Sequence, residues 1–150
     1  MSDSRIRVVC RNGLLLALCT VALSGCLSST EAKPSNLQLS GDWMYTGVQT
    51  GSARENLTGQ LRILGESGTS FQGRLDIVGV NEASGETRVM GGTVSGSAEG
   101  NAIDFDANVE ATARRHVGQI DGSIITGTWV GSSAGGIMSS GTFRAERKSQ

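Results

Sequence analysis

The chain has 150 residues, of which 37% are hydrophobic and only 4% aromatic, and its formal net charge is −1 at pH 7. This length accommodates one domain with a modest core. The basic residues are scattered and the aromatics are few, so the chain lacks the phosphate-neutralising patch and the base-stacking platform of nucleic-acid-binding proteins. We therefore expect no nucleic acid among its partners.

Residues 1–25 have the composition of a secretory signal peptide. Three arginines precede the apolar run Leu14–Leu23 (LLLALCTVAL), which is shorter than the roughly 20 residues of a transmembrane helix. Residues 23–26 (LSGC) resemble the lipobox of bacterial lipoproteins. The resemblance implies lipid transfer to the Cys26 thiol, cleavage before Cys26 and acylation of the new N-terminus. The alternative is a secreted protein with a chance cysteine near its cleavage site.

The residues after Cys26 predict where the protein is held. No cysteine follows it, and the two earlier ones leave with the signal peptide, so the mature chain forms no internal disulfide. By the same resemblance, Leu27 in place of an aspartate favours the outer membrane, on its periplasmic or surface face. We predict a signal peptide at 1–25, a lipidated cysteine with a solvated tether at 26–39, and one domain at 40–150.

The domain shows a hydrophobic period of two along its whole length. In FQGRLDI (residues 71–77) and IDFDANV (residues 103–109), apolar or small residues alternate with polar ones. Clusters of Gly, Ser, Asn and Glu separate most of these segments. We predict eight strands at about residues 41–50, 55–64, 70–80, 86–98, 101–110, 114–124, 125–131 and 137–147.

A glycine recurs between two apolar residues on the same face of several predicted strands, as at Gly59, Gly73, Gly96 and Gly127. Glycine weakens a flat strand, but it lets a strand coil sharply enough to close a small barrel. Closure also removes exposed edge strands. We therefore predict an all-β fold, a single antiparallel up-and-down β-barrel of about eight strands. A flattened β-sandwich with glycines at bulges is the alternative.

The start of the first predicted strand, Gly41-Asp42-Trp43, resembles the opening Gly-x-Trp of lipocalins and other calycins, including the avidins. The resemblance implies that Trp43 closes one end of the barrel and that a basic residue near the last strand, Arg144 or Arg147, packs over it. The second lipocalin motif and the biotin-contacting pattern of avidins are absent. The resemblance therefore implies a shape and no particular ligand.

The predicted inward faces supply the candidate ligand-binding side chains, namely Trp43, Phe71, Leu75, Phe105, His116, Ile120, Trp129 and Phe143. With few large side chains to fill the barrel, we expect a slender apolar cavity. Its open end is expected near His116, on an inward face that also carries Gly118, Ile120, Gly122 and Ile124. A lone histidine of this kind binds a ligand or, more commonly, a buried carbonyl.

The alternating acids of DFDANVE (residues 104–110) superficially resemble a calcium-binding loop, but Val109 stands where an EF-hand requires glycine. We expect a solvated outer face on which Arg114 and Arg115, beyond a turn at 111–113, pair with these acids. His116 is the only histidine, so we expect no metal, no cofactor and no catalytic constellation.

The sequence thus favours a non-catalytic, membrane-anchored envelope lipoprotein that binds a small apolar ligand in its barrel. The alternative is a protein-binding module, such as an inhibitor of an envelope or secreted enzyme, because small inhibitors of secreted metalloproteases have similar barrels; a structural envelope lipoprotein is a further alternative. An open apolar cavity favours ligand binding, whereas a filled barrel with an exposed apolar patch favours protein binding.

Overall fold

The computed structural model describes residues 38–149, except 52, 111, 134–135 and 137. The predicted signal peptide, Cys26 and the tether as far as residue 37 lie outside the described residues. Lipidation of Cys26 therefore stays a prediction. Within the described part, no helix has the length and hydrophobicity that a membrane span needs.

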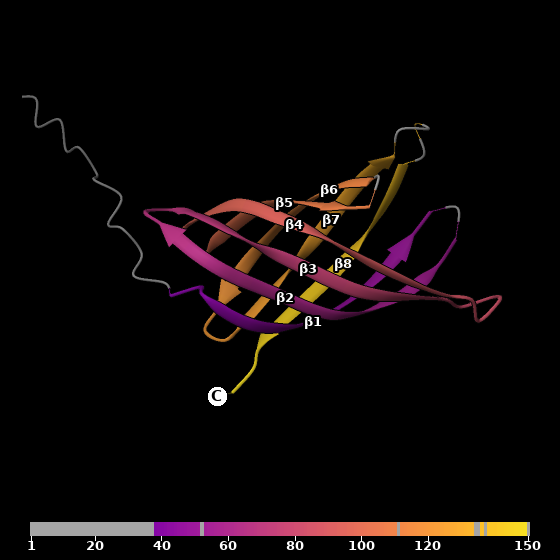
Figure 1. The fold of residues 1–150 in the computed structure, drawn as a ribbon, viewed down its shortest axis with the longest axis horizontal. Helices are drawn as coiled ribbons and strands as arrows, with labels where there is room; N and C mark the ends of the chain where they lie inside the picture. The colour runs from indigo at the N-terminus through magenta and orange to yellow at the C-terminus, as the bar shows by residue number, and fades with distance from the viewer. Residues whose placement is uncertain (1–37, 52, 111, 134–135, 137, 150) are drawn as a thin grey trace, which may run out of the picture. The chain divides into compact units, whose positions relative to one another are not determined.

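The described residues form eight antiparallel strands that close into one barrel (Figure 1). Each strand pairs with the next along the chain, and β1 pairs with β8 to complete the ring. The prediction of an all-β, up-and-down barrel is confirmed. The strands are β1 (Gly41–Thr50), β2 (Glu55–Ser67), β3 (Ser70–Asn81), β4 (Thr87–Glu99), β5 (Ala102–Val109), β6 (Thr112–Asp121), β7 (Ile124–Ser133) and β8 (Met138–Arg147).

The sixth strand begins and ends earlier than predicted. It starts at Thr112, inside the expected turn, and it ends at Asp121. Gly122 adopts a left-handed φ of 58° in the tight turn to β7, so it is exposed and does not face the interior. Ile124 begins β7 and is only half-buried. The expected inward face is therefore wrong at Gly122 and Ile124, because a turn interrupts the apolar pattern there.

The inward glycines bring neighbouring strands closer than any side chain would allow. A Cβ added at Gly92 would lie 1.7 Å from the carbonyl oxygen of Asn108 on β5. One added at Gly118 would lie 2.5 Å from the carbonyl oxygen of Thr126, so a leucine there cannot fit unless the backbone moves. These glycines let the strands coil into a narrow barrel, as the sequence predicts.

The barrel has two ends that differ in construction. At one end, which we call the Trp43 end, short turns join β2 to β3, β4 to β5 and β6 to β7, and the chain enters β1. At the other, the loop end, the longer connections lie between β1 and β2, β3 and β4, and β7 and β8. The β2–β3 turn lies at the left of Figure 1 and the β3–β4 loop at its right.

Candidate functional site in the barrel interior

All of the predicted interior side chains point inward from their strands. Each is no more than 5% exposed, and they come from β1, β3, β5, β6, β7 and β8. These residues are Trp43, Phe71, Leu75, Phe105, His116, Ile120, Trp129 and Phe143. The period-two pattern thus assigned their faces correctly.

Aromatic rings pack against one another across the middle of the barrel. His116 stacks on Phe105, with ring centroids 4.4 Å apart and planes 7° from parallel. Phe143 meets the edge of the His116 ring at 5.1 Å, and Tyr45 stacks on Phe143 at 5.8 Å. His116 is 0% exposed. The expected opening beside His116 is therefore wrong, because the close approach of the strands lets the rings fill the centre.

Both ring nitrogens of His116 are engaged. Nδ1 lies 3.2 Å from the backbone oxygen of Arg114, which can only accept, so Nδ1 carries the proton and donates. Nε2 then accepts from the hydroxyl of Tyr45 at 3.2 Å. Burial lowers the pKa of His116 to about 4 and raises that of Tyr45, so both groups are neutral near pH 7. Their role here is to order the core.

The Trp43 end is closed by the segment that leads into β1. The buried Leu39, which the sequence assigned to the tether, packs into the core, and its carbonyl accepts a hydrogen bond from Nε1 of Trp43 at 2.9 Å. The guanidinium of Arg147 lies 4.3 Å from the centre of the Trp43 ring. It also donates to the carbonyl oxygens of Ser40 and Gln38. Arg147, and not the outward Arg144, is thus the basic residue that covers Trp43.

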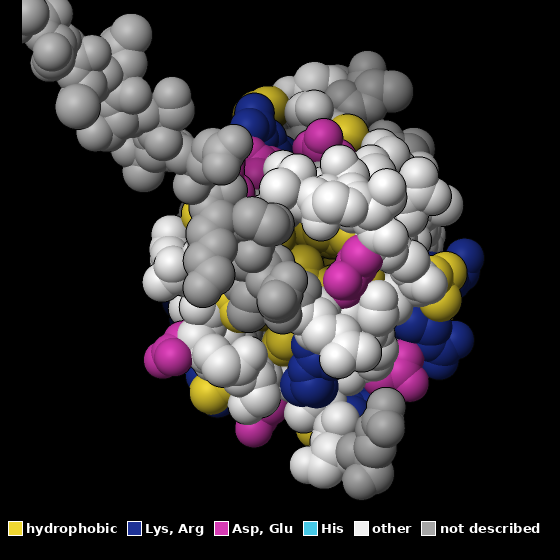
Figure 2. Space-filling model, turned by 90° about the vertical axis from the view of Figure 1, so that its left-hand side faces the viewer, with side chains coloured by type: hydrophobic (Ala, Val, Ile, Leu, Met, Phe, Trp, Pro, Cys, Tyr) yellow, Lys and Arg dark blue, Asp and Glu magenta, His cyan; other side chains and the backbone are white. Residues whose placement is uncertain are grey.

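A β-bulge in β2 completes this closure. The pairing of β2 with β3 shifts between Ile63 and Gly65, and beyond the shift the carboxylate of Glu66 accepts hydrogen bonds from the backbone and hydroxyl of Ser40. The pocket beneath Leu39 and Phe71 measures about 10 Å³, room for roughly one water molecule. Figure 2 looks onto this end of the barrel, where hydrophobic side chains are visible in a hollow with an acidic side chain beside them.

The loop end holds a second arginine–tryptophan pair. Arg114 of β6 is 3% exposed, and its guanidinium lies 4.6 Å from the centre of the Trp129 ring of β7. The sequence placed Arg114 on the outer face beside Arg115, and that placement is wrong. Because side chains alternate along β6, Arg114 shares the inward face of His116. Of these two arginines, Arg115 is the one that lies on the outer face, where its guanidinium pairs with the carboxylate of Asp104 at 2.5 Å.

This second pair is incompletely hydrogen-bonded. Among the described residues, Nε and Nη1 of Arg114 and Nε1 of Trp129 are buried without a partner. Nη2 of Arg114 donates to the Met90 sulfur at 3.5 Å, the one hydrogen bond recorded for it among the described residues. Glu55, whose side chain is 12% exposed, instead pairs with Arg88 at 2.8 Å. Burial lowers the pKa of Arg114, whereas the nearby Glu55 and Glu110 raise it.

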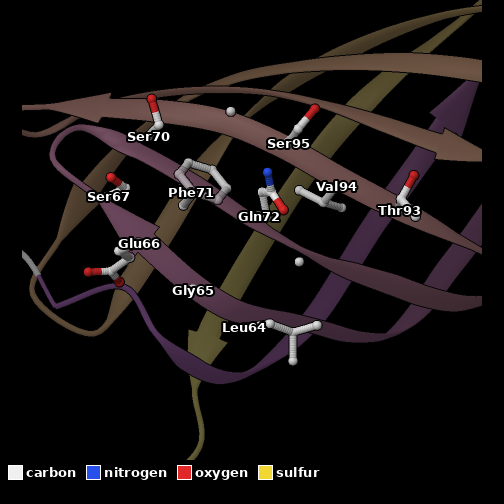
Figure 3. A pocket seen from close by; sticks show the side chains of 12 residues that line it. Leu64, Gly65, Glu66, Ser67, Ser70, Phe71, Gln72, Thr93, Val94 and Ser95 are labelled. Atoms are coloured by element: carbon white, nitrogen blue, oxygen red, sulfur yellow. The ribbon is translucent and has the colours of Figure 1, made fainter.

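The outer wall offers a groove of a different kind (Figure 3). It has a volume of about 650 Å³ and is lined by residues 64–67 of β2, 70–73 of β3 and 93–96 of β4. Leu64, at the bulge, is 68% exposed and borders the groove opposite Thr93 and Ser95. In the described part of the chain, no cluster of His, Cys, Asp and Glu is placed to hold a metal ion.

The sequence could have revealed the Arg114 site. Tyr45, Met90 and Arg114 are buried interior residues that were not proposed as candidates. Tyr45 lies two positions from Trp43 and Arg114 two from His116, so parity alone places them inside. Charged residues usually face water, and for this reason we predict an outward Arg114 from the sequence.

No protein-family model and no curated protein sequence matches this chain. Solved structures share its fold at low identity. EF1p2_mFAP2b bound to DFHBI has a TM-score of 0.56 at 14% identity and covers 73% of this chain and 94% of its own. The redesigned β-barrel mFAP0 bound to DFHBI has a TM-score of 0.52 at 15% identity, with 73% and 98% covered.

A natural protein also shares the fold. The S-type phycobiliprotein lyase CPES of Guillardia theta has a TM-score of 0.50 at 8% identity, and the match covers 75% of this chain and 89% of that one. At such identities the likeness extends to the fold alone. The chain is therefore a small, closed barrel of eight antiparallel strands.

Proposed function

We propose that this protein is a non-catalytic binding barrel, anchored to the cell envelope through a lipid on Cys26, that receives a small, largely apolar molecule at its loop end. The observation that carries the proposal is the contrast between the two ends. Residues 38–40 close the Trp43 end with hydrogen bonds to Trp43, Glu66 and Arg147. This closure favours entry of a ligand from the loop end.

The side chains that fill the loop half can move. A Cβ added at Gly79 would meet the side chains of Glu55, Leu57 and Met90, and one added at Gly131 would meet those of Arg114, Ser139 and Thr112. Backbone limits the space elsewhere, because Cβ atoms at Gly59 and Gly96, and at Gly141 within the loop half, would strike neighbouring backbone. Met90 and Arg114 are long and unbranched, so they can withdraw and admit a guest.

The comparisons support this proposal at the level of fold. The mFAP barrels are bound to a small molecule, DFHBI, and their chains match nearly end to end. The engaged state of His116 also favours binding over catalysis, because neither ring nitrogen is free to transfer a proton.

The test uses the full protein, produced in a bacterial envelope and reconstituted in lipid nanodiscs. We expect a fluorescent fatty-acid analogue to bind and to be displaced by excess natural lipid, with empty nanodiscs as the control. Native mass spectrometry of gently purified protein should reveal a retained small molecule. Absence of both signals would refute ligand binding.

The anchor is tested separately. We expect wild-type protein to incorporate labelled palmitate, and the Cys26→Ser variant to remain an unlipidated precursor. Serine lacks the thiol that accepts the diacylglyceryl group, so normal labelling of the variant would refute the assignment. A Cys19→Ser variant, altered in the apolar run, is the matched control and should be labelled normally.

A protein-binding function is the second candidate, favoured by the packed rings in the centre and by exposed apolar residues outside. Leu64 borders the 650 Å³ groove, and Val117 and Val130 are each 51% exposed. Native mass spectrometry separates the two candidates, because a protein partner would appear at a stoichiometric mass. Leu64→Ser should then weaken the complex, and Val89→Ser, which alters an exposed residue outside the groove lining, should not.

A further inference from the structure

Two arginine–tryptophan pairs occupy opposite ends of this barrel, and they differ in how far the described residues satisfy their donors. At the Trp43 end, the indole and both terminal nitrogens of Arg147 reach backbone carbonyls. At the loop end, the corresponding indole of Trp129 and two nitrogens of Arg114 find no partner among the described residues. The guanidiniums lie at similar distances from their rings, 4.3 and 4.6 Å. The difference therefore lies in hydrogen bonding.

Buried donors without acceptors cost free energy, and a buried charge costs more. Such groups are uncommon in folded proteins, and three of them gathered on two contacting side chains point to an absent acceptor. Arg114 forms no ion pair among the described residues, and the nearby Glu55 pairs with Arg88. An arginine also keeps its charge at any physiological pH, so it cannot escape the cost by losing its proton.

We infer that Arg114 and Trp129 form a receptor for the carboxylate of a small, apolar carboxylic acid. This inference rests on the proposed function and names the chemical class of its ligand. A carboxylate is planar and carries two oxygens that match the arginine fork. The two oxygens can accept from Nη2 and Nε or from Nη2 and Nη1, so either arrangement gives one unpartnered nitrogen an acceptor. The indole Nε1–H of Trp129 is a further donor of the same site.

Binding requires Met90 to move. Nη2 has the Met90 sulfur as its only described contact, and a thioether is a weak acceptor that a carboxylate readily replaces. The methionine side chain is flexible. The side chains of Met90 and Leu57 both lie close to Gly79, so withdrawal of Met90 would leave apolar space beside Leu57. The apolar part of the ligand would occupy that space. Anchoring by Arg114 thus fixes the orientation, with the acid group against Arg114 and Trp129.

The test measures hexanoate against hexanamide by calorimetry on the nanodisc-reconstituted protein. The two probes share size and shape, but only hexanoate is charged. We expect hexanoate to bind more tightly, and Arg114→Met to weaken it by roughly 10- to 100-fold. Trp129→Phe keeps a ring under the guanidinium but removes one donor, so a smaller loss is expected. Arg115→Met is the matched control, since the neighbouring Arg115 faces outward and pairs with Asp104.

Each result decides the inference. Equal binding of the two probes, or hexanoate binding that survives Arg114→Met, would overturn the carboxylate site and leave a binding barrel. An equal loss in Arg115→Met would assign the effect to surface charge and overturn it as well. No hexanoate binding to the wild type would also overturn it, and the proposed function would fall only if the fatty-acid analogue failed too. Circular dichroism and unfolding curves confirm that each variant is folded.

Discussion

The Trp43 end and the loop end use the same two residue types for different purposes. Arg147 covers Trp43 and is held by the carbonyls of Gln38 and Ser40, which the incoming chain carries across that end. Arg114 covers Trp129 in the same way, but its free nitrogens reach no described acceptor. The same arginine–tryptophan stack is thus held by backbone acceptors at one end and lacks them among the described residues at the other.

Removing either tryptophan should have the largest effect on stability. We expect Trp43→Ala and Trp129→Ala to lower the free energy of unfolding by about 3–5 kcal/mol each. Trp43→Ala should lie at the upper end, because it also frees the buried carbonyl of Leu39. Urea unfolding measures both, with Trp129→Phe as the conservative control. Melting of both alanine variants within a degree or two of the wild type would contradict the inward placement of these rings.

Acid should destabilise the centre that separates the two ends. The pKa of His116 is about 4 in the folded protein, below its ordinary value of 6.5, so the unfolded chain takes up the proton first as the pH falls. The contribution of neutral, buried His116 to the free energy of unfolding is complete above about pH 6.5. It is lost as the pH falls from 6.5 to 4, which lowers the free energy of unfolding by roughly 3 kcal/mol. Urea unfolding across this range measures it.

His116→Gln should abolish that pH dependence, because glutamine does not titrate. The pKa of Asp42 is lowered by Arg62 and lies below its ordinary value of 3.8, so Asp42→Asn should leave the slope between pH 6.5 and 4 intact. A wild-type protein equally stable at pH 6.5 and pH 4.5 would contradict the buried, neutral His116.

Replacing each arginine by methionine tests the contrast between the ends directly, because only the change at the Trp43 end should lower stability. Arg147→Met removes a ring contact and hydrogen bonds to two carbonyls, so we expect a loss of roughly 1–3 kcal/mol. Arg114→Met removes a buried charge with unpartnered nitrogens, so stability should be unchanged or rise by up to about 2 kcal/mol. Guanidinium unfolding compares them. Equal losses at the two ends would contradict the distinction.

The smallest change in stability is expected from a substitution on the outer wall. That change is the reference against which the arginine substitutions at the two ends are compared. Arg115 and Asp104 pair there in a solvated setting. Arg115→Met should change the melting temperature by no more than about 2 °C, and the difference should vanish in 1 M salt. A shift as large as that of Arg147→Met would mean that surface charge, and not burial, governs these arginines.

Much of this architecture follows from alternation along the strands. The inward faces of β3 and β5 can be read directly from residues 71–77 and 103–109, and the glycines on those faces predict closure. The Gly-x-Trp resemblance also gives the position of Trp43 and offers Arg147 as one of two possible covers. The end of β6 is not predictable in this way, because Gly122 continues the apolar pattern into a turn.

The sequence alone predicts a small barrel, most of its inward side chains and the lipobox-like stretch that precedes it, because all of these depend on local composition and spacing. Whether the interior is open depends on how closely strands approach and how rings from six strands meet, and neither is encoded in any one segment. The same holds for Arg114. Its inward direction follows from parity with His116. Its lack of acceptors among the described residues depends on Glu55, Arg88 and Met90, which only the folded barrel brings to the same end.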